Sequence, residues 1–462
     1  MIGMTLADIA AAVGGTLHGV PDKDLEVTGP VEYDSRAVRP GGLFVAFAGA
    51  KVDGHDFAPT ALAAGAVAVL GTRPVDAPTI VVADPLAALG RLARAVVDRL
   101  PDLTIVGITG SSGKTTTKDQ IGQVLARHGA TVAPAGSFNN ELGLPHTVLK
   151  ADADTRYLVL EKGARGIGHI AYLCGIAPPR IGVVINVGDA HIGEFGSVEA
   201  IARAKGELVE ALPAAAAGGV AVLNVDDARV RAMAARTSAR VAFVGEDGTA
   251  DPRAVDVRLD ARGRASYTLV TAAGSAPVTL AVPGAHQVGN SLAAAAVGLA
   301  VGMDLADVAA ALADLRAVSS RRMDVFDRAD GVTVIDDSYN ANPSSTAAAL
   351  RALVTVGDGR RTIAALGYMA ELGDHERAGH EGVGRLAAEL GVDLLVAVGD
   401  AGPIHDGALT VAQWGGKSVH VTDQAQAVAL LRDELKPGDV VLVKGSRYRT
   451  WDIADALREV TA

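Results

Sequence analysis

Residues 109–116 read TGSSGKTT and directly follow the apolar run 103–108. Glycines in such a turn let successive backbone N–H groups point at phosphate oxygens, and the N-terminus of a following helix adds positive charge. Lys114 would reach the β- and γ-phosphates of a nucleotide, and the Thr115 hydroxyl would bind Mg²⁺. The usual eight-residue loop has a glycine where Ile108 stands, so the match is to a shorter variant, and a purely structural turn is the alternative. The nucleotide-binding residues expected here are Gly110, Ser111, Ser112, Gly113, Lys114, Thr115 and Thr116.

Two more apolar runs, at 157–160 and 181–187, resemble the strand before this loop, and each ends near polar residues. Parallel strands buried on both faces have this composition, and ligands bind at their carboxyl ends. We therefore expect a parallel α/β sheet between residues 103 and about 317.

The regions on either side of this sheet also alternate between helices and strands. Short strands at 42–46 and 79–82 lie among alanine-rich helices before residue 102. A further α/β region begins near residue 319, with strands expected at 332–335, 362–366, 394–398 and 440–443 and a helix at 344–354. The predicted fold class is α/β with three domains, at 1–102, 103–317 and 318–462.

The composition supports several cores and excludes some classes of protein. The 462 residues are 49% hydrophobic and 21% charged, which excludes a disordered chain and fits about three domains of roughly 150 residues. The formal net charge of −11 argues against a nucleic-acid-binding surface. The single cysteine, Cys174, excludes a disulfide framework and a multi-cysteine zinc site.

The stretch 265–303 carries no charged residue, which raises the question of a membrane span. A spanning helix needs about 20 consecutive apolar residues, and Pro277, Pro283 and His286 interrupt this stretch. We expect a strand, a turn and a buried helix instead, with no stable membrane insertion. The first residues lack a secretory signal pattern, so a cytoplasmic location is expected.

Three polar residues lie just after consecutive expected strands or on the helix that follows them. Glu161 closes one strand, His191 follows the next, and Lys205 lies on a helix that begins near residue 197. Each is a weak signal alone, because surface carboxylates, loop histidines and solvated lysines are common. Their shared placement beside a phosphate loop favours a cation site, since phosphoryl transfer needs added positive charge.

These motifs and several others together resemble the Mur ligase family. The motifs that carry the resemblance, besides TGSSGKTT, are DSR at 34–36, Gly49, DGH at 53–55, NN at 139–140, EKGA at 161–164, AH at 190–191, AKGE at 204–207, GAH at 284–286 with Asn290, DDSYNANP at 336–343, ELG at 371–373 and KGSR at 444–447. The resemblance covers essentially the whole chain. Within the family, the chain is most similar to the dipeptide-adding branch.

The resemblance implies a small UDP-sugar-binding domain, a central P-loop ATPase domain and a C-terminal Rossmann-like domain. It further implies an ATP-dependent amide-bond ligase that works through an acyl phosphate. The implied acceptor is UDP-N-acetylmuramoyl-tripeptide, the implied amine is D-alanyl-D-alanine, and the implied cofactors are two Mg²⁺ ions. We expect a monomer with no nucleic-acid partner.

The resemblance also implies roles for individual residues. Lys114 and Thr115 would hold the ATP phosphates and Mg²⁺, Glu161 and His191 would be metal ligands, and Lys205 would carry a CO₂-derived carbamate. His286 and Asn290 would lie by the adenine, with Arg322 and Asp337 reaching ATP from the third domain. The implied substrate-binding residues are Ser35, Arg36, Asp53, Gly54, His55, Asn139, Asn140, Tyr339, Asn340, Asn342 and Tyr368.

Three positions depart from the family pattern and leave alternatives open. Lys162 stands where methionine is usual, and its positive charge is expected to weaken metal binding at the neighbouring Glu161. Asp189 stands where an uncharged residue is more common, and Tyr368 stands where the family often has an aspartate. One alternative is a related ligase with a changed amine substrate such as D-alanyl-D-lactate. Others are an amino-acid-adding or folylpolyglutamate-type ligase, or a nucleotide-binding homologue without activity.

Overall fold

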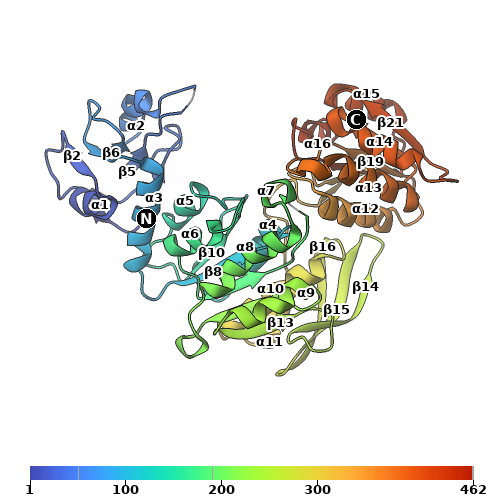
Figure 1. Cartoon of the computed structure of the whole chain (residues 1–462), viewed down its shortest axis with the longest axis horizontal. Helices are drawn as coiled ribbons and strands as arrows, with labels where there is room; N and C mark the ends of the chain where they lie inside the picture. Colours follow the sequence, from blue (N-terminus) through green and yellow to red (C-terminus); the bar gives the residue numbers. More distant parts are fainter. Residues whose placement is uncertain (50, 190, 460–462) are drawn as a thin grey trace.

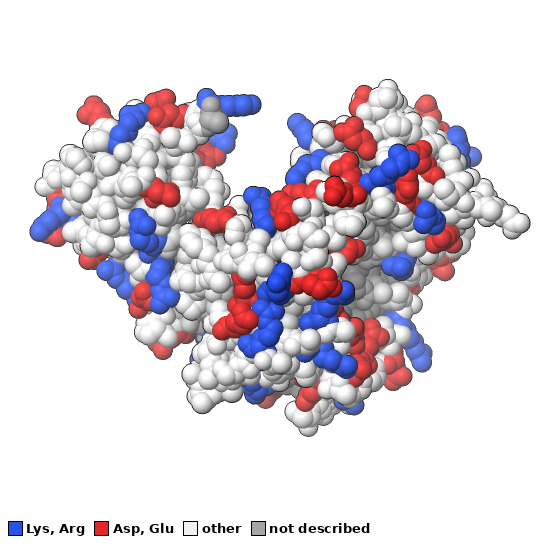
Figure 2. Space-filling view, in the orientation of Figure 1, with Lys and Arg blue, Asp and Glu red and all other residues white. Residues whose placement is uncertain are grey.

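The computed structural model describes residues 1–49, 51–189 and 191–459 and places three α/β regions one after another (Figure 1). Ala190 of the AH motif lies outside the described residues. Among the described residues, no helix combines the length and the apolar character needed to span a bilayer. The N-terminal and third regions flank the central one, and Figure 2 shows the molecule hollowed between them. Acidic and basic side chains are interspersed over this face.

The N-terminal region is built on a five-stranded sheet in the order β2-β7-β6-β5-β4. Its elements are β1 (Met4–Thr5), α1 (Leu6–Val13), β2 (Thr16–His18), β3 (Glu26–Val27), β4 (Val31–Glu32), β5 (Gly42–Val45), the 3₁₀ turn η1 (Gly54–Phe57), α2 (Ala58–Ala63), β6 (Ala66–Gly71), β7 (Thr79–Val81) and α3 (Pro85–Asp98). Helix α3 contacts α5 (Gly143–Val148) and α6 (His169–Ile176) of the central region, and one apolar core runs across this boundary.

The central region is a six-stranded parallel sheet in the order β13-β12-β11-β8-β10-β9. Its strands are β8 (Thr104–Thr109), β9 (Thr131–Val132), β10 (Tyr157–Glu161), β11 (Ile181–Val184), β12 (Val220–Asn224) and β13 (Arg240–Val244). The neighbours of β8 are β11 and β10, so the strand order reverses there. A crevice at the carboxyl ends of parallel strands opens at such a reversal, which places the TGSSGKTT loop in it.

Helices cover both faces of this sheet. They are α4 (Lys114–Ala126), α5 (Gly143–Val148), α6 (His169–Ile176), α7 (Ile192–Phe195), α8 (Val198–Glu210), α9 (Ala228–Ala232), α10 (Gln287–Ala300) and α11 (Leu305–Ala313), with 3₁₀ turns η2 (Ala215–Ala217) and η3 (Met233–Arg236). Helix α4 packs on α10, and α6 packs on α8. Strand β11 ends at Val184, earlier than the expected 181–187, because the chain then turns to the phosphate loop, where Asn186 accepts the Ser111 N–H.

A three-stranded antiparallel sheet was not expected in the central region. It consists of β14 (Arg253–Leu259), β15 (Arg264–Thr271) and β16 (Gly274–Pro283), in that order. The sequence predicts a single strand at the start of the uncharged stretch 265–303. The structure has two strands of a hairpin there, followed by the expected turn and buried helix. The hairpin was missed because its strands carry small and polar residues in place of a long apolar run.

The third region is a six-stranded sheet in the order β17-β18-β22-β19-β20-β21, with only β17 antiparallel to its neighbour. Its elements are β17 (Asp324–Asp327), β18 (Thr333–Asp336), α12 (Pro343–Gly357), β19 (Thr362–Leu366), η4 (Gly373–His375), α13 (Glu376–Glu389), β20 (Leu394–Val398), η5 (Gly399–Ala401), α14 (Gly402–Leu409), β21 (Lys417–Val421), α15 (Gln424–Glu434), β22 (Val440–Lys444) and α16 (Trp451–Arg458). Separate apolar cores fill its two faces. The fold class is the expected one: α/β with three domains.

Candidate active site

The TGSSGKTT loop joins β8 to α4 and is held by a residue from a neighbouring strand end. The Asn186 side-chain oxygen accepts hydrogen bonds from the backbone N–H groups of Ser111 and Ser112, at 2.9 and 3.0 Å. Gly113 caps α4 with φ of +79°, a conformation that side-chain-bearing residues rarely adopt. The first turn of α4 consequently presents its N–H groups to the cavity, as anion binding requires. Sequence reasoning missed Asn186, because nothing local links it to the loop.

Lys114 and Thr115 open helix α4, and both make polar contacts. The Lys114 ammonium donates to the carbonyl of Gly110 at 2.8 Å. Burial, and then the charge of Arg322, lower the Lys114 pKa from its usual value, while Glu161 opposes this shift. Thr115 is buried and its hydroxyl accepts a hydrogen bond from Arg322 at 3.1 Å. The phosphate loop of the central domain is therefore already in contact with the third domain.

Glu161 ends strand β10 and is 2% exposed. One carboxylate oxygen accepts a hydrogen bond from the Ser137 hydroxyl at 2.9 Å, while the other is buried without a partner. Asn139 donates to Ser137 at 3.0 Å and lies 3.5 Å from Glu161. A buried carboxylate oxygen without a hydrogen bond is costly, so this atom is suited to a cation.

Lys118 fixes the loop that carries Ser137, a role that the sequence did not reveal. It is 3% exposed on α4, and its ammonium donates to the carbonyls of Pro134 and Gly136, the latter at 3.0 Å. The neighbouring Asp119 accepts the backbone N–H of Ser319 at 3.1 Å. Helix α4 thus positions both the loop around Glu161 and the segment leading to the third domain.

Lys205 lies on α8 and is 5% exposed. Its ammonium has no hydrogen-bond partner among the described residues. Burial lowers the Lys205 pKa well below its usual value, and the charge of Lys114 lowers it further. Because Lys114 is also influenced by Glu161, the three charged groups share one electrostatic environment beside the phosphate loop.

The third domain supplies a cation and a buried ion pair to the same place. The Arg322 guanidinium stacks over the Tyr339 ring at 4.0 Å from its centre. Lys444, 2% exposed, donates to Asp337 at 2.5 Å and to the Asn340 carbonyl at 3.0 Å. Asp337 also accepts the Met323 N–H, so the pair fixes the backbone beside Arg322.

A cavity of about 500 Å³ lies between these two domains and brings most of the expected nucleotide residues together. Among its lining residues are Ser111, Ser112, Gly113, Lys114, Thr115, Thr116, Asn139, His191, His286, Asn290, Arg322, Asp337, Tyr339, Asn340 and Asn342. Asn290 also accepts a hydrogen bond from Thr117 on α4. Glu161 and Lys205 are almost fully buried and are not among the lining residues.

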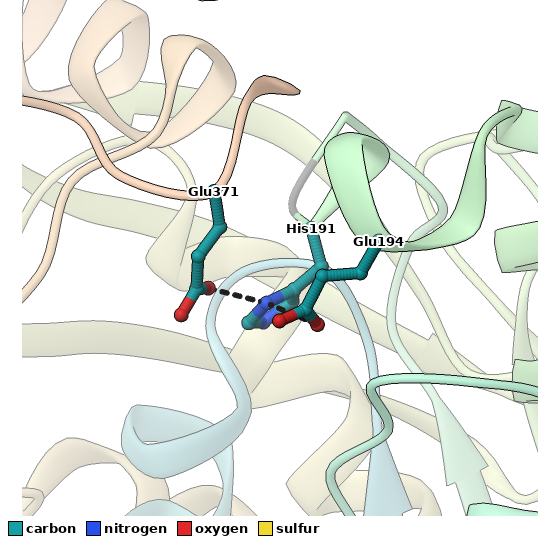
Figure 3. Close-up of side chains that lie close together, drawn as sticks. All are labelled: His191, Glu194 and Glu371. Carbon is teal, nitrogen blue, oxygen red and sulfur yellow. Dashed lines mark ion pairs between the residues drawn. The ribbon is translucent and has the colours of Figure 1, made fainter.

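His191 contacts the third domain (Figure 3). It caps α7, and its Nδ1 atom lies 2.5 Å from a carboxylate oxygen of Glu371. Arg447 binds the other oxygen of Glu371 at 2.9 Å. The His191 ring first, and then the Arg447 charge, lower the Glu371 pKa to about 2. Glu371 belongs to the ELG motif noted in the sequence, but the sequence did not predict its pairing with His191.

The motifs expected to grip a UDP-sugar lie in the N-terminal domain, outside that cavity. Ser35 is buried, whereas Arg36 is exposed and its interaction with Asp34 lowers the Asp34 pKa to about 2. Asp53 precedes Gly54 and accepts hydrogen bonds from the backbone and ring of His55. The other ring nitrogen of His55 accepts the Thr72 N–H at 3.0 Å. His55 therefore shapes this turn from inside, and Arg36 is the side chain available to a ligand.

Three other expected substrate residues have structural contacts. Asn140 accepts two N–H groups at the start of α5, and Asn342 caps α12. The Tyr368 hydroxyl donates to Glu376 at 2.5 Å, which is the main cause that raises the Tyr368 pKa to about 12. Its ring stacks on His380, and Tyr368 does not line the cavity.

The expectation that Lys162 weakens metal binding at Glu161 is not supported by its position. Lys162 directly follows strand β10, and its side chain reaches the end of helix α6 instead of the Glu161 carboxylate. It is 0% exposed and its ammonium donates to the carbonyls of Leu173 and Ala177, at 3.1 and 3.0 Å, at the end of α6. Glu207 accepts two N–H groups at the start of the same helix. Opposite charges thus complement the helix dipole at its two ends.

Replacing Lys162 with methionine should flatten the alkaline pH dependence of stability. Burial lowers the Lys162 pKa, so between that value and the ordinary one the unfolded chain binds more protons than the folded chain. Wild-type stability consequently rises with pH across this window, and the variant lacks that contribution. Calorimetric Tm measurements from about pH 7 to about pH 10 would show it. Lys150→Met, at an exposed position, is the control, and equal slopes in all three proteins would contradict this role.

Three α/β domains around a phosphate loop, with a buried carboxylate and a buried lysine nearby, are the arrangement expected of an ATP-dependent amide-bond ligase. The Mur ligase family, catalytic domain, matches residues 29–97, the Mur ligase middle domain matches 108–298, and the Mur ligase, glutamate ligase domain, matches 321–447. The chain belongs to the Mur ligase family. The resemblance seen in its motifs is thereby confirmed.

Individual relatives cover nearly the whole chain. The UDP-N-acetylmuramoyl-tripeptide–D-alanyl-D-alanine ligase of Mycobacterium leprae is 50% identical, with 96% of each chain covered, and that of Escherichia coli is 35% identical, with 99% of each covered. The crystal structure of MurF from Acinetobacter baumannii aligns with a TM-score of 0.86 at 32% identity, covering 99% of both chains. MurF from Thermotoga maritima in complex with ADP has a TM-score of 0.78 at 31% identity and covers 95% of this chain and 99% of its own.

Proposed function

We propose that this chain is an ATP-dependent ligase that joins D-alanyl-D-alanine to UDP-N-acetylmuramoyl-tripeptide. The products are the pentapeptide precursor of peptidoglycan, ADP and phosphate. The proposal is supported by the relatives that carry this name and align over the full length. The observation that carries it is that buried Glu161 and buried Lys205 both act on the charge of Lys114, which lines the cavity together with Arg322 of the third domain.

The residues present fit a nucleotide with two Mg²⁺ ions. Thr115 supplies a hydroxyl, Glu161 supplies the buried carboxylate oxygen without a partner, and His191 supplies an imidazole nitrogen. Mg²⁺ bound there would neutralise phosphate charge during phosphoryl transfer. Lys205 fits a carbamate, because its depressed pKa favours the neutral amine that reacts with CO₂. This reaction forms an N–C bond and releases one proton, and it converts a cation into an anionic oxygen donor.

The chain's own groups account for the electrostatic demand of the reaction. A carboxylate is a poor electrophile until it is converted to an acyl phosphate, and the amine then displaces phosphate. Negative charge accumulates in both steps, so fixed cations give most of the acceleration. Lys114 would hold the terminal phosphates. Arg322, oriented by Tyr339, would add a second cation from the third domain.

Docking of the third domain completes this site. Arg322 reaches the Thr115 hydroxyl only because the third domain lies against the phosphate loop. Closure of the domains would also keep water away from the acyl phosphate, which otherwise hydrolyses. We place the UDP-sugar on the N-terminal domain, the nucleotide in the central domain, and the dipeptide on the third-domain side. The boundaries proposed remain 1–102, 103–317 and 318–462, in a cytoplasmic monomer.

A turnover assay with a panel of amines tests the proposal. Purified protein is incubated with UDP-N-acetylmuramoyl-tripeptide, ATP, Mg²⁺ and one amine at a time, and product masses are recorded. We expect strong preference for D-alanyl-D-alanine over D-alanyl-D-lactate, single D-amino acids and diaminopimelate. Absence of an extended product with every amine would refute the proposal, and preference for the depsipeptide would replace it with the altered-amine alternative.

Replacing Arg36 with alanine should raise the KM for the UDP-linked substrate about 10- to 100-fold with little change in kcat. A charge-assisted hydrogen bond contributes about 1.5–3 kcal/mol, and Arg36 is exposed next to buried Ser35. Because Arg36 lies outside the nucleotide cavity, the loss should fall on ground-state binding. Steady-state kinetics would measure it, with Arg99→Ala at another exposed arginine of this domain as the control. An unchanged KM would remove Arg36 from the substrate site.

A further inference from the structure

One cluster of metal-binding side chains joins two domains. His191 and Glu194 belong to the central domain and Glu371 to the third, and one candidate ligand atom from each lies within 4.8 Å of the others. Figure 3 shows the ring and the two carboxylates facing one another. His191 and Glu371 are partly buried and Glu194 is exposed, with side-chain exposures of 27%, 28% and 33% respectively.

The atom at the centre of this cluster lacks a hydrogen bond. His191 Nδ1 is inaccessible to solvent and has no hydrogen-bond partner of acceptable geometry, although Glu371 is 2.5 Å away and Glu194 is 3.7 Å away. Buried polar atoms without a partner are uncommon and mark places where an ion or ligand belongs. Three ligand atoms from His and carboxylate groups are a set suited to a divalent cation.

The backbones around the cluster are built for close approach. The Gly193 N–H donates to the Glu371 carbonyl at 3.2 Å. A Cβ atom added to Gly193 would lie 2.5 Å from the Gly373 nitrogen, so any larger residue would separate the two loops. The two domains therefore meet at the point where the three ligands converge.

The charges also favour a cation. Glu194 and Glu371 bring two negative charges to one imidazole, and Arg447 engages only the Glu371 oxygen that faces away from His191. The oxygen on the His191 side is left for a ligand role. Glu161 does not belong to this cluster.

We propose that His191, Glu194 and Glu371 bind a divalent cation that bridges the central and third domains and stabilises their docked arrangement. The proposed function uses His191 as a metal ligand within the central domain, and this inference rests on it for that residue alone. It adds Glu194 and the third-domain Glu371. Binding of the cation would then favour the arrangement in which Arg322 contacts Thr115.

Mn²⁺ titration followed by electron paramagnetic resonance tests the site without nucleotide or peptide substrate. Glu371→Gln and Glu194→Gln should each weaken Mn²⁺ binding about 10- to 100-fold. Glu389→Gln, at an exposed position of the third domain, should not. A Glu161→Gln protein should keep one Mn²⁺ site that the added Glu371→Gln change removes. Equal Mn²⁺ affinity in wild type and Glu371→Gln, or loss of all binding in Glu161→Gln, would overturn the proposal.

The Gly193→Ala variant tests whether cation binding depends on the contact between the two domains, because it disturbs that contact without removing a ligand. It keeps all three side chains but places a Cβ against Gly373, so we expect weaker Mn²⁺ binding and no Mn²⁺-dependent compaction in small-angle X-ray scattering. Gly166→Ala is the matched control, because a Cβ there meets no atom within 4 Å. Normal Mn²⁺ affinity in Gly193→Ala would show that the third domain supplies no ligand. Because no turnover is measured, these outcomes are independent of the amine-panel assay.

Discussion

Replacing Lys114 with alanine should lower kcat about 10²- to 10³-fold and suppress ADP formation and ligated product together. Removing one preorganised charge that acts on the transition state has an effect of this size. Lys114 opens α4 immediately after the glycine that turns the loop, and its ammonium already lies on the loop at the Gly110 carbonyl. Arg322 cannot replace it, because its guanidinium is engaged with Thr115 and the Tyr339 ring.

The assay should follow ADP and peptide product separately. A variant that still hydrolysed ATP but made no product would place Lys114 in the second step only. Lys23→Ala removes an exposed lysine of the N-terminal domain and should behave as wild type. Thermal unfolding of both variants shows whether each is folded. Turnover of folded Lys114→Ala equal to wild type would refute the assignment of the nucleotide site.

The fold was predictable wherever a buried strand appears as an apolar run. Residues 362–366 and 394–398 are strands β19 and β20 with the expected bounds, because both faces of each are buried. The hairpin β15–β16 was missed because only alternate residues of it face the core. A strand with one exposed face carries small and polar residues, and its pattern is then too weak to separate two strands from one.

The site was predictable where the chemistry lies in one short stretch and not where it depends on distant contacts. The loop, Glu161 and Lys205 are each marked by local motifs, and the strand order places the loop next to the end of β10, where Glu161 lies. Asn186 and Lys118 support the site through contacts that only the folded chain creates. Glu371 illustrates the same limit: its motif was visible, but its partner is about 180 residues away in sequence.

Lys162 shows how a departure from a family pattern can mislead. Adjacent positions in sequence suggest adjacent charges, and a cation next to Glu161 would weaken metal binding. In the folded chain the Lys162 ammonium is directed to the carboxyl end of α6, where it donates to two backbone carbonyls. The substitution is therefore a feature of helix packing and not of the metal site.

Replacing Lys205 with alanine should reduce kcat about 10²- to 10³-fold, a loss comparable to that of a transition-state charge donor. Lys205 is buried on α8, and its pKa is well below the usual value. A neutral amine at this position can add CO₂, and the proposed carbamate would then supply the anionic oxygens that alanine lacks. Removing the charge alone would relieve repulsion with Lys114, so a large loss of activity indicates the carbamate and not the cation.

Two measurements separate the carbamate from a merely structural lysine. Wild-type protein equilibrated with ¹³C-labelled bicarbonate should show a carbamate carbon resonance that is absent from Lys205→Ala. Added formate or acetate should restore part of the activity of Lys205→Ala, because a small carboxylate can occupy the space left by the side chain. Lys150→Ala should retain both the resonance and full activity. A wild-type protein without the resonance, together with no rescue of the variant, would leave Lys205 as a buried amine and remove the carbamate from the proposed metal site.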